Sequence, residues 1–445
     1  MELADVERLA VDFHRFANRY APLFGVWAAQ EHGERYLRGL LLGQAERRNA
    51  ENLAERVGGP SARAVQRFLT EAPWPTERVI ERLQTDVAAL LEHPDGVWVV
   101  DETGFAKQGT KSAGVARQYS GTLGKVGNCQ VGVFLGYRSE RGQALVDGRL
   151  YLPERWTDDR ERCRAAGIPD EVPFQTKPEI ALAMLRAAHE RGELQARWVT
   201  GDAVYGNNPA FRDGLDADGS WYVLEVPSSI LVRPVRTDAP PPVVLKNGWR
   251  LRSDLGPVQS VAEVAAGLDP ECWQLLTVAE GAQGPRVYQF AQQRVREVRG
   301  GAIKAEQELV FRRNPDGSEL KHYLANTPRG IALLTLGRVA SARWSIETGF
   351  EQAKGEVGLD EYEVRSWAGW HHHVTLALLA NLFLLTIRQD WGGKSAPTDD
   401  PSGESGAGRA AATADLDPGR PAGLAHADPG QQRRRQTLAY QAAAT

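Results

Sequence analysis

The strongest constraint on the fold comes from residues 96–104, GVWVVDETG, where apolar and β-branched residues run directly into two acids. A run of this kind is typical of a buried strand. The segments that follow alternate between strand-like and helix-like patterns, in the order CQVGVFLGYRS, ALVDGRLYLP, PEIALAMLRAAHERGE, ARWVTG, NPAFRDGLDADG and SWYVLEVP. Strand, strand, strand, helix, strand, helix, strand is an order that predicts an α/β fold with a mixed sheet over residues 94–226.

Residues 1–93, which precede this sheet, space their apolar side chains as helices do. Gly58 interrupts one short apolar stripe, and Ser61 is placed to cap the next helix. Two short helices across a Gly-containing turn resemble a DNA-reading helix-turn-helix. The face of the second helix that we expect to be exposed carries Arg63, Gln66 and Arg67. A plain helical hairpin is the alternative interpretation.

Three further segments follow the mixed sheet. Residues 227–328 are irregular and β-rich, with turn signals such as NPDG, which indicates an insertion rather than a continuation of the sheet. Helical periodicity returns over residues 329–390. Residues 391–445 are rich in Ala, Gly, Pro and Asp and predict a disordered tail, because such a segment buries too little apolar surface to offset its ordering entropy.

Composition excludes several classes of protein. The chain has 53 Lys and Arg against 57 Asp and Glu, which excludes a uniformly basic nucleic-acid binder but allows a local basic groove. Its three cysteines are far apart in the sequence, without the paired spacing of a zinc site or a disulfide framework, which favours a reducing compartment. The longest apolar run, residues 374–387, predicts a buried helix rather than a membrane span.

Three acids occupy positions that favour metal-dependent chemistry. Asp101 closes the first predicted strand, Asp202 closes the strand of WVTGD, and Glu347 lies on the helix after the insertion. Carboxylates at the ends of neighbouring strands, joined by one from a packed helix, can converge on two Mg²⁺ ions that assist phosphodiester cleavage. The alternative is that each acid has a structural role only. Glu351 and, more weakly, Glu356 are rivals for the third position.

The helix that carries Glu347 has a distinctive face. Arg343, Glu347, Phe350 and Lys354 follow one another at i, i+4, i+7 and i+11, so they line one side over about three turns. An Arg one turn before and a Lys two turns after a metal-binding Glu are placed to hold the phosphates that flank a scissile bond. A solvated face with ordinary ion pairs is the alternative.

Together these motifs resemble the DDE-type insertion-sequence transposases over roughly residues 40–389. The catalytic domain of that family has a ribonuclease-H-like fold, and one large group carries an inserted β domain and a Tyr-x2-Arg-x3-Glu-x6-Lys signature. Arg343, Glu347 and Lys354 match the last three signature positions with the right spacing. Ala340 stands at the tyrosine position, so the phosphate contact of that tyrosine has no counterpart here.

The resemblance implies a function and a set of partners. Asp101, Asp202 and Glu347 would hold two Mg²⁺ ions, for which Mn²⁺ can substitute. A homodimer would bind double-stranded DNA at the paired terminal repeats, cleave it, and join the freed 3′-hydroxyl to target DNA. The expected setting is the bacterial cytoplasm, at the nucleoid and away from membranes. The alternatives are an inactive or repurposed transposase that regulates by binding DNA, and a stand-alone nuclease of the same fold.

Other side chains gain candidate roles beside this resemblance. Basic residues that flank the first aspartate are candidates for phosphate contacts, with a plain surface role as the alternative: Lys107, Lys111, Arg117 and Lys125. Trp249 and Trp273 in the insertion are candidates to stack on an unpaired base, although tryptophans more often pack. The triplet at residues 371–373 is predicted to be solvated or capping histidines, because adjacent histidines on a helix point in different directions.

Overall fold

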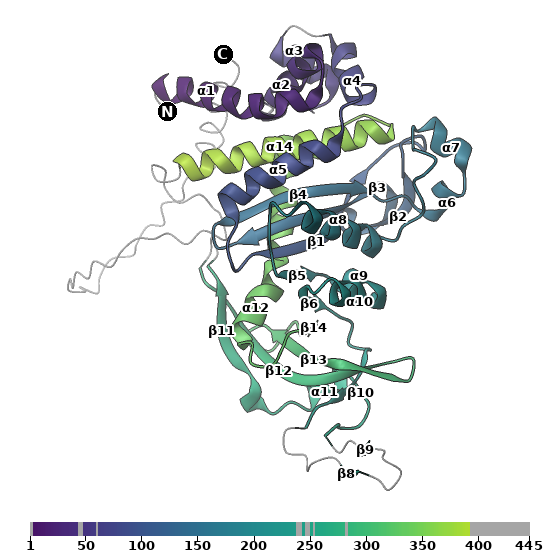
Figure 1. Ribbon diagram of the computed structural model, residues 1–445, viewed down its shortest axis with the longest axis vertical. Helices are drawn as coiled ribbons and strands as arrows, with labels where there is room; N and C mark the ends of the chain where they lie inside the picture. The colour runs from purple at the N-terminus through teal and green to yellow at the C-terminus, as the bar shows by residue number, and fades with distance from the viewer. Residues whose placement is uncertain are drawn as a thin grey trace, which may run out of the picture.

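The computed structural model describes residues 3–42, 48–58, 61–236, 243–244, 250–251, 254–280 and 284–391. The predicted tail, apart from its first residue, lies outside the described residues, and so does Trp249. Figure 1 shows an elongated molecule in which a helical layer, a large twisted sheet and a β-rich end follow one another along the long axis.

The N-terminal part of the chain is helical, as predicted; its described residues form five α-helices, of which α2, α4 and α5 pack with the last helix, α14 (Figure 1). Their bounds are α1 Leu3–Tyr20, α2 Trp27–Leu42, α3 Ala50–Val57, α4 Ala62–Thr70 and α5 Thr76–Leu91, with a 3₁₀ turn, η1, at Ala21–Phe24. Ser61 caps α4 as predicted: its side chain accepts a hydrogen bond from the Ala64 amide at 3.3 Å.

Helix α14, Trp367–Trp391, lies beside α5, between α2 and α4 on one side and strand β4 of the sheet on the other. It is apolar around most of its circumference, which is typical of a helix with neighbours on several sides. By length and composition α14 is sufficient to cross a bilayer, and 67% of its most apolar window is buried inside the protein. The predicted buried helix over residues 374–387 is confirmed.

All the predicted strands and helices of the mixed sheet are present, and β2, α6, α7 and α9 are additional to them. Strand β1 is antiparallel to β3 and parallel to β5, and β5 is parallel to β6, while β2 and β4 both pair with β3. The strands are β1 Val97–Ala106, β2 Ala116–Ser120, β3 Lys125–Ser139, β4 Gly142–Leu150, β5 Trp198–Gly201 and β6 Trp221–Glu225. The shorter elements between them are η2 Gly121–Leu123, α6 Glu154–Thr157, α7 Arg160–Ala165, α8 Lys177–Arg191, α9 Ala203–Gly206 and α10 Pro209–Ala217. This arrangement is the ribonuclease-H-like α/β architecture.

The β-rich region was expected not to continue the sheet, and this expectation was wrong. Strand β14 is hydrogen-bonded to β6, so the ladder runs on through β13, β12, β7 and β10 without a break. The elements are β7 Leu231–Pro234, β8 Val243–Val244, β9 Arg250–Leu251, β10 Gln259–Ser260, α11 Val261–Ala266, η3 Pro270–Cys272, β11 Gln274–Ala279, β12 Arg286–Arg299, β13 Ala302–Arg313 and β14 Lys321–Ala325. The region still has a core of its own, built around Val295, Leu309 and Phe311.

Two consecutive helices return the chain from the insertion to the first strand. Helix α12 spans Leu333–Ala342 and α13 spans Trp344–Val357. The apolar side of α13 packs against the sheet, where Phe350 meets Phe134 of β3 edge to face with ring centroids 5.2 Å apart. This packing fixes the helix that carries Glu347 beside the strand that carries Asp101.

Candidate active site

Asp101 and Asp202 are neighbours because of the register between two parallel strands. Val100 of β1 pairs with Gly201 of β5, so the next residue on each strand is an aspartate. Adjacent strands lie about 4.8 Å apart, which places the two carboxylates side by side. Asp101 is 8% exposed. Asp202 ends its strand by capping α9, where its Oδ1 accepts from the Val204 amide at 2.9 Å.

Arg343 connects this strand end to the helix. Its Nη1 lies 3.2 Å from Oδ2 of Asp101, and its Nη2 lies 2.6 Å from Oε1 of Glu347. The i, i+4 ion pair of the alternative interpretation therefore exists, with Arg343 at the N-cap of α13, but its Arg is shared with the buried aspartate. The three predicted acids come from β1, the end of β5 and α13, and one guanidinium joins two of them.

Burial and like charge make the aspartates costly to ionise together. Burial and the neighbouring Asp202 raise the pKa of Asp101 to about 7, while Arg343 opposes the shift. Burial, followed by the charge of Glu102, raises the pKa of Asp202. Carboxylates held close together in a partly dehydrated setting are the donor set that hard divalent cations such as Mg²⁺ prefer. The residues present therefore fit a divalent metal site.

The three acids are not drawn tightly together. Among the described residues, the one group of three potential ligands whose donor atoms lie within 4.8 Å of one another is elsewhere, at His93, Asp95 and Glu140. At the predicted site the Arg343 guanidinium bonds both Asp101 and Glu347. Bound cations would compete with this guanidinium for the same oxygens.

The sequence matches the family model described as DDE superfamily endonuclease over residues 19–285. The chain belongs to the DDE superfamily of endonucleases. Enzymes of this superfamily use divalent metal ions. The match includes Asp101 and Asp202 but ends before α13, so the role of Glu347 depends on the geometry described above.

One relative is the probable transposase for insertion sequence element IS701 of Microchaete diplosiphon. It is 30% identical over 202 residues, which are 44% of this chain and 48% of the relative. The aligned part therefore spans about half the length of that transposase.

In this DDE-superfamily chain the rivals of Glu347 lie elsewhere. Glu351 is exposed on α13, and the structure gives it no link to the aspartates. Glu356 forms an ion pair with Arg388 of α14. Glu347 is the α13 acid that shares a partner with Asp101, which favours it as the third ligand.

Lys354 points toward β1 rather than into solvent. Its Nζ donates to Thr103 Oγ1 at 2.8 Å and to Thr122 Oγ1 at 3.1 Å. Burial lowers the pKa of this lysine. The predicted face of α13 is therefore buried in part, with Phe350 packed and both cations engaged, and is not a fully solvated face. Ala340, at the tyrosine position of the signature, is buried on α12.

Two acids near the site were missed in the sequence. Gly201 pairs with Leu224 of β6, so the residues that follow them, Asp202 and Glu225, are neighbours. The Glu225 carboxylate forms an ion pair with Lys321, with Oε2 and Nζ 3.0 Å apart. Glu102 accepts from Tyr205 at 2.9 Å and binds Lys177 at 2.8 Å. The signal for Glu225 was present, because WYVLE ends in an acid after an apolar run just as VWVVD does.

The other predicted DNA contacts divide into exposed and engaged residues. Arg63, Gln66 and Arg67 lie on the exposed face of α4, as predicted. The exposed basic residues near β1 are Lys111, Arg117 and Lys125. Lys107 is engaged instead: its Nζ donates to the Tyr362 carbonyl at 3.1 Å and lies 3.4 Å from the centroid of that ring. Trp273 packs on the insertion core, with the Arg313 guanidinium 3.8 Å from its ring centroid.

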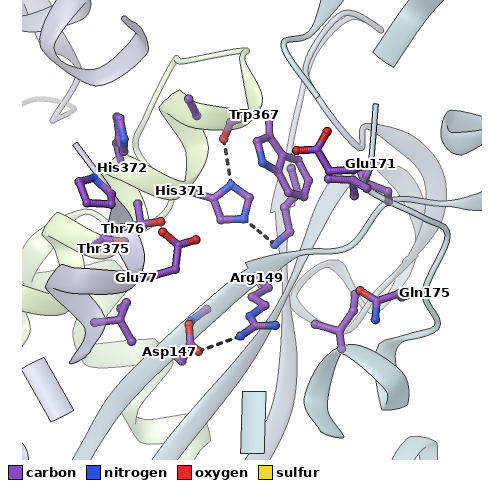
Figure 2. A pocket seen from close by; sticks show the side chains of 18 of the residues that line it. Thr76, Glu77, Asp147, Arg149, Glu171, Gln175, Trp367, His371, His372 and Thr375 are labelled. Carbon is purple, nitrogen blue, oxygen red and sulfur yellow. Dashed lines mark hydrogen bonds and ion pairs between the residues drawn. The ribbon is translucent and has the colours of Figure 1, made fainter. Parts of the chain in front are cut away.

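The histidine triplet was predicted to be solvated or capping; solvation was wrong for two of the three, which instead bond carbonyls at the C-terminal ends of α4 and α13. His372 and His373 are buried, and both bond to backbone carbonyls. His371 lines the pocket in Figure 2, a cavity of about 510 Å³ between α5, β4 and the start of α14. Its Nδ1 bonds the Trp367 carbonyl at 3.0 Å. None of the three predicted ligands lines this cavity.

Proposed function

We propose that this chain is a transposase that binds the ends of its mobile element, cleaves the DNA there and joins the freed ends to target DNA. One observation carries the proposal: two strand-end aspartates in adjacent register, with a helix-borne glutamate tied to one of them through Arg343. Membership of the DDE superfamily and similarity to a probable transposase support the same function.

Asp101, Asp202 and Glu347 would hold the divalent ions, Mg²⁺ or Mn²⁺. When bound, two such ions supply activation of the attacking oxygen and stabilisation of the leaving oxygen in phosphodiester cleavage. Arg343 offers a planar guanidinium at the rim of the acids, placed to receive a phosphate. Lys354, held by Thr103 and Thr122, positions α13 against β1 and adds positive charge beside the path of the DNA.

Recognition of the terminal repeats is assigned to the N-terminal helices. The exposed face of α4, with Arg63, Gln66 and Arg67, is the proposed reading surface. Lys111, Arg117 and Lys125 are proposed to contact phosphates near the cleavage point, whereas Lys107 would have to leave Tyr362 to do so. A homodimer on paired ends is proposed because joining two ends to one target requires two catalytic sites close together.

The test is divalent-metal-dependent cleavage of duplexes that carry the terminal repeats flanking the gene. Glu347→Gln removes the third carboxylate, and Glu351→Gln, one turn away on the same helix, is the matched control. We expect wild type and Glu351→Gln to cut at the repeat boundary and Glu347→Gln to bind without cutting. Tight repeat binding without cleavage by any of the three proteins would instead indicate a DNA-binding regulator. Cleavage that does not depend on the sequence of the terminal repeats would indicate a stand-alone nuclease.

A further inference from the structure

The turn between β2 and β3 lies against the candidate active site. Lys354 of α13 bonds both Thr103 of β1 and Thr122 of this turn. Thr103 is two residues after Asp101 and therefore shares its face of the strand. Glu347 and Lys354 are seven residues apart on α13, about 10 Å along the helix axis. The β2–β3 hairpin, residues 116–129, thus ends about two helical turns from the proposed catalytic glutamate.

The charge of this region has one sign. Between Glu102 and Glu140 the chain has no acidic residue, and its charged residues there are Lys107, Lys111, Arg117, Lys125 and Arg138. Within the described part of the chain, the structure gives Lys111, Arg117 and Lys125 no ion pair, and all three are exposed. A surface that is cationic and unneutralised beside a phosphodiester-cleaving site is complementary to a DNA backbone.

The hairpin also exposes an aromatic ring. Tyr119 is 62% exposed and stands opposite Val126, which is 54% exposed, in the β2–β3 register. Arg117 shares the outward face of β2 with Tyr119, whereas Ala116 and Ser120 are buried. An exposed ring supported by an apolar neighbour and flanked by cations is the combination that single-stranded nucleic-acid sites use, since stacking accepts any base while the cations hold the backbone.

We propose that the β2–β3 hairpin binds the DNA strand next to the scissile phosphate, with Tyr119 stacked on an unpaired base and Arg117 and Lys125 on the flanking phosphates. This inference rests on the proposed function and adds the residue that senses unpaired DNA. Trp273, the described tryptophan first considered for stacking, is covered by Arg313 and packs on the insertion core. Tyr119 has its ring free and lies near the site.

The experiment compares binding of two DNA probes by the full chain, with Glu347→Gln added to every protein so that no cleavage occurs. One probe is a fully paired duplex with the terminal repeat, and the other is the same duplex with a short unpaired flap at the repeat boundary, labelled with 2-aminopurine. We expect Tyr119→Ala to weaken binding of the flap probe on the order of tenfold, to leave the paired probe unaffected, and to abolish the quenching of 2-aminopurine. Tyr119→Phe keeps the ring and should behave as wild type.

The cations are tested in the same assay by salt dependence. Arg117→Ala and Lys125→Ala should weaken both probes, and each should reduce the slope of log K against log salt by about one. Phe174→Ala removes an exposed aromatic side chain outside the hairpin and should change nothing. Unaltered melting temperatures would show that the variants are folded.

Two outcomes overturn the inference alone, and a third overturns the proposed function together with it. If Tyr119→Ala in the Glu347→Gln background binds the flap probe as Glu347→Gln alone does, while wild type cleaves the repeat in the cleavage assay, the hairpin assignment fails alone. If Tyr119→Ala changes the oligomeric state and not DNA binding, the hairpin contacts a second protein copy instead. If no protein binds either probe, the proposed function itself fails.

Discussion

Arg343 and Asp101 form an ion pair across 242 positions of the chain, with Nη1 and Oδ2 3.2 Å apart. The Nη2 atom of the same guanidinium lies 2.6 Å from Oε1 of Glu347, so one positive charge pairs with both Glu347 of α13 and Asp101 of β1. A cation that takes Asp101 and Glu347 as ligands meets this charge as a repulsive neighbour. The guanidinium therefore stabilises the two carboxylates and opposes the binding of a metal ion to them.

Arg343→Gln should separate metal binding from cleavage. Removing the guanidinium takes a repulsive charge away from the acids, so Mn²⁺ should bind more tightly, on the order of tenfold by isothermal titration. Cleavage should nevertheless fall sharply if Arg343 makes the proposed contact with a DNA phosphate, because that charged contact is lost. Arg338→Gln removes an exposed arginine of α12 and is the matched control. Weaker Mn²⁺ binding by Arg343→Gln would mean that Arg343 organises the ligands rather than opposing the ions.

Gly104→Ala should displace the β2–β3 hairpin from β1. A Cβ at Gly104 would lie 2.1 Å from Oγ and 2.9 Å from Cβ of the buried Ser120 side chain. Overpacking of this kind typically costs about 1–3 kcal/mol of stability. Ser120→Gly removes both clashing atoms, so the double variant should melt at a higher temperature than Gly104→Ala alone. A purely additive double variant would contradict the contact between hairpin and strand.

His373 should make stability depend on pH between about 6.5 and 4. Burial lowers its pKa from 6.5 to about 4, while Nε2 donates to backbone carbonyls and Nδ1 bonds the Tyr36 hydroxyl at 2.8 Å. The unfolded chain takes up this proton at a higher pH than the folded chain does. The contribution of neutral His373 to the free energy of unfolding is therefore fully present above about pH 6.5, and it is lost as the pH falls toward 4. The full loss is about 3 kcal/mol.

The measurement is the melting temperature as a function of pH for wild type and His373→Asn. The variant should lose stability at every pH, yet its melting temperature should fall less steeply between pH 6.5 and 4 than that of wild type. His14→Asn, an exposed histidine of α1, should keep the wild-type slope. Equal slopes in all three proteins would contradict the assignment of this pH dependence to His373.

The local sequence pattern could predict the parts of the site that lie at the end of a strand or on one face of a helix. Asp101 and Asp202 follow apolar runs, and the helical spacing of Arg343, Glu347 and Lys354 places them on one side of α13, with Arg343 at its N-cap. The partners of those side chains could not be predicted, since Thr122 and Thr103 meet Lys354 only through tertiary packing.

The incorrect predictions have the same origin. Pairing of β14 with β6 joins strands about a hundred residues apart, and nothing in the local pattern of either strand specifies it. His372 and His373 are buried because α14 has neighbours on most sides, whereas a triplet on a surface helix would have been solvated. Long-range neighbours, rather than propensity, decided both cases.

Arg212 and Glu297 should couple the ribonuclease-H-like core to the insertion. Arg212 of α10 and Glu297 of β12 are both buried, and their Nη2 and Oε1 atoms are 2.5 Å apart. Arg212→Met would leave the Glu297 carboxylate buried with Arg299 as a distant partner at 3.9 Å, so the melting temperature should drop in line with a loss of about 3 kcal/mol. The double variant with Glu297→Leu removes the unpaired buried charge and should recover most of the loss.

The control is Asp213→Asn, which breaks an exposed ion pair with Arg299 and should cost under about 1 kcal/mol. A double variant no more stable than Arg212→Met would show that the arginine stabilises this junction by packing and by its bond to the Gly206 carbonyl, and not by pairing with Glu297.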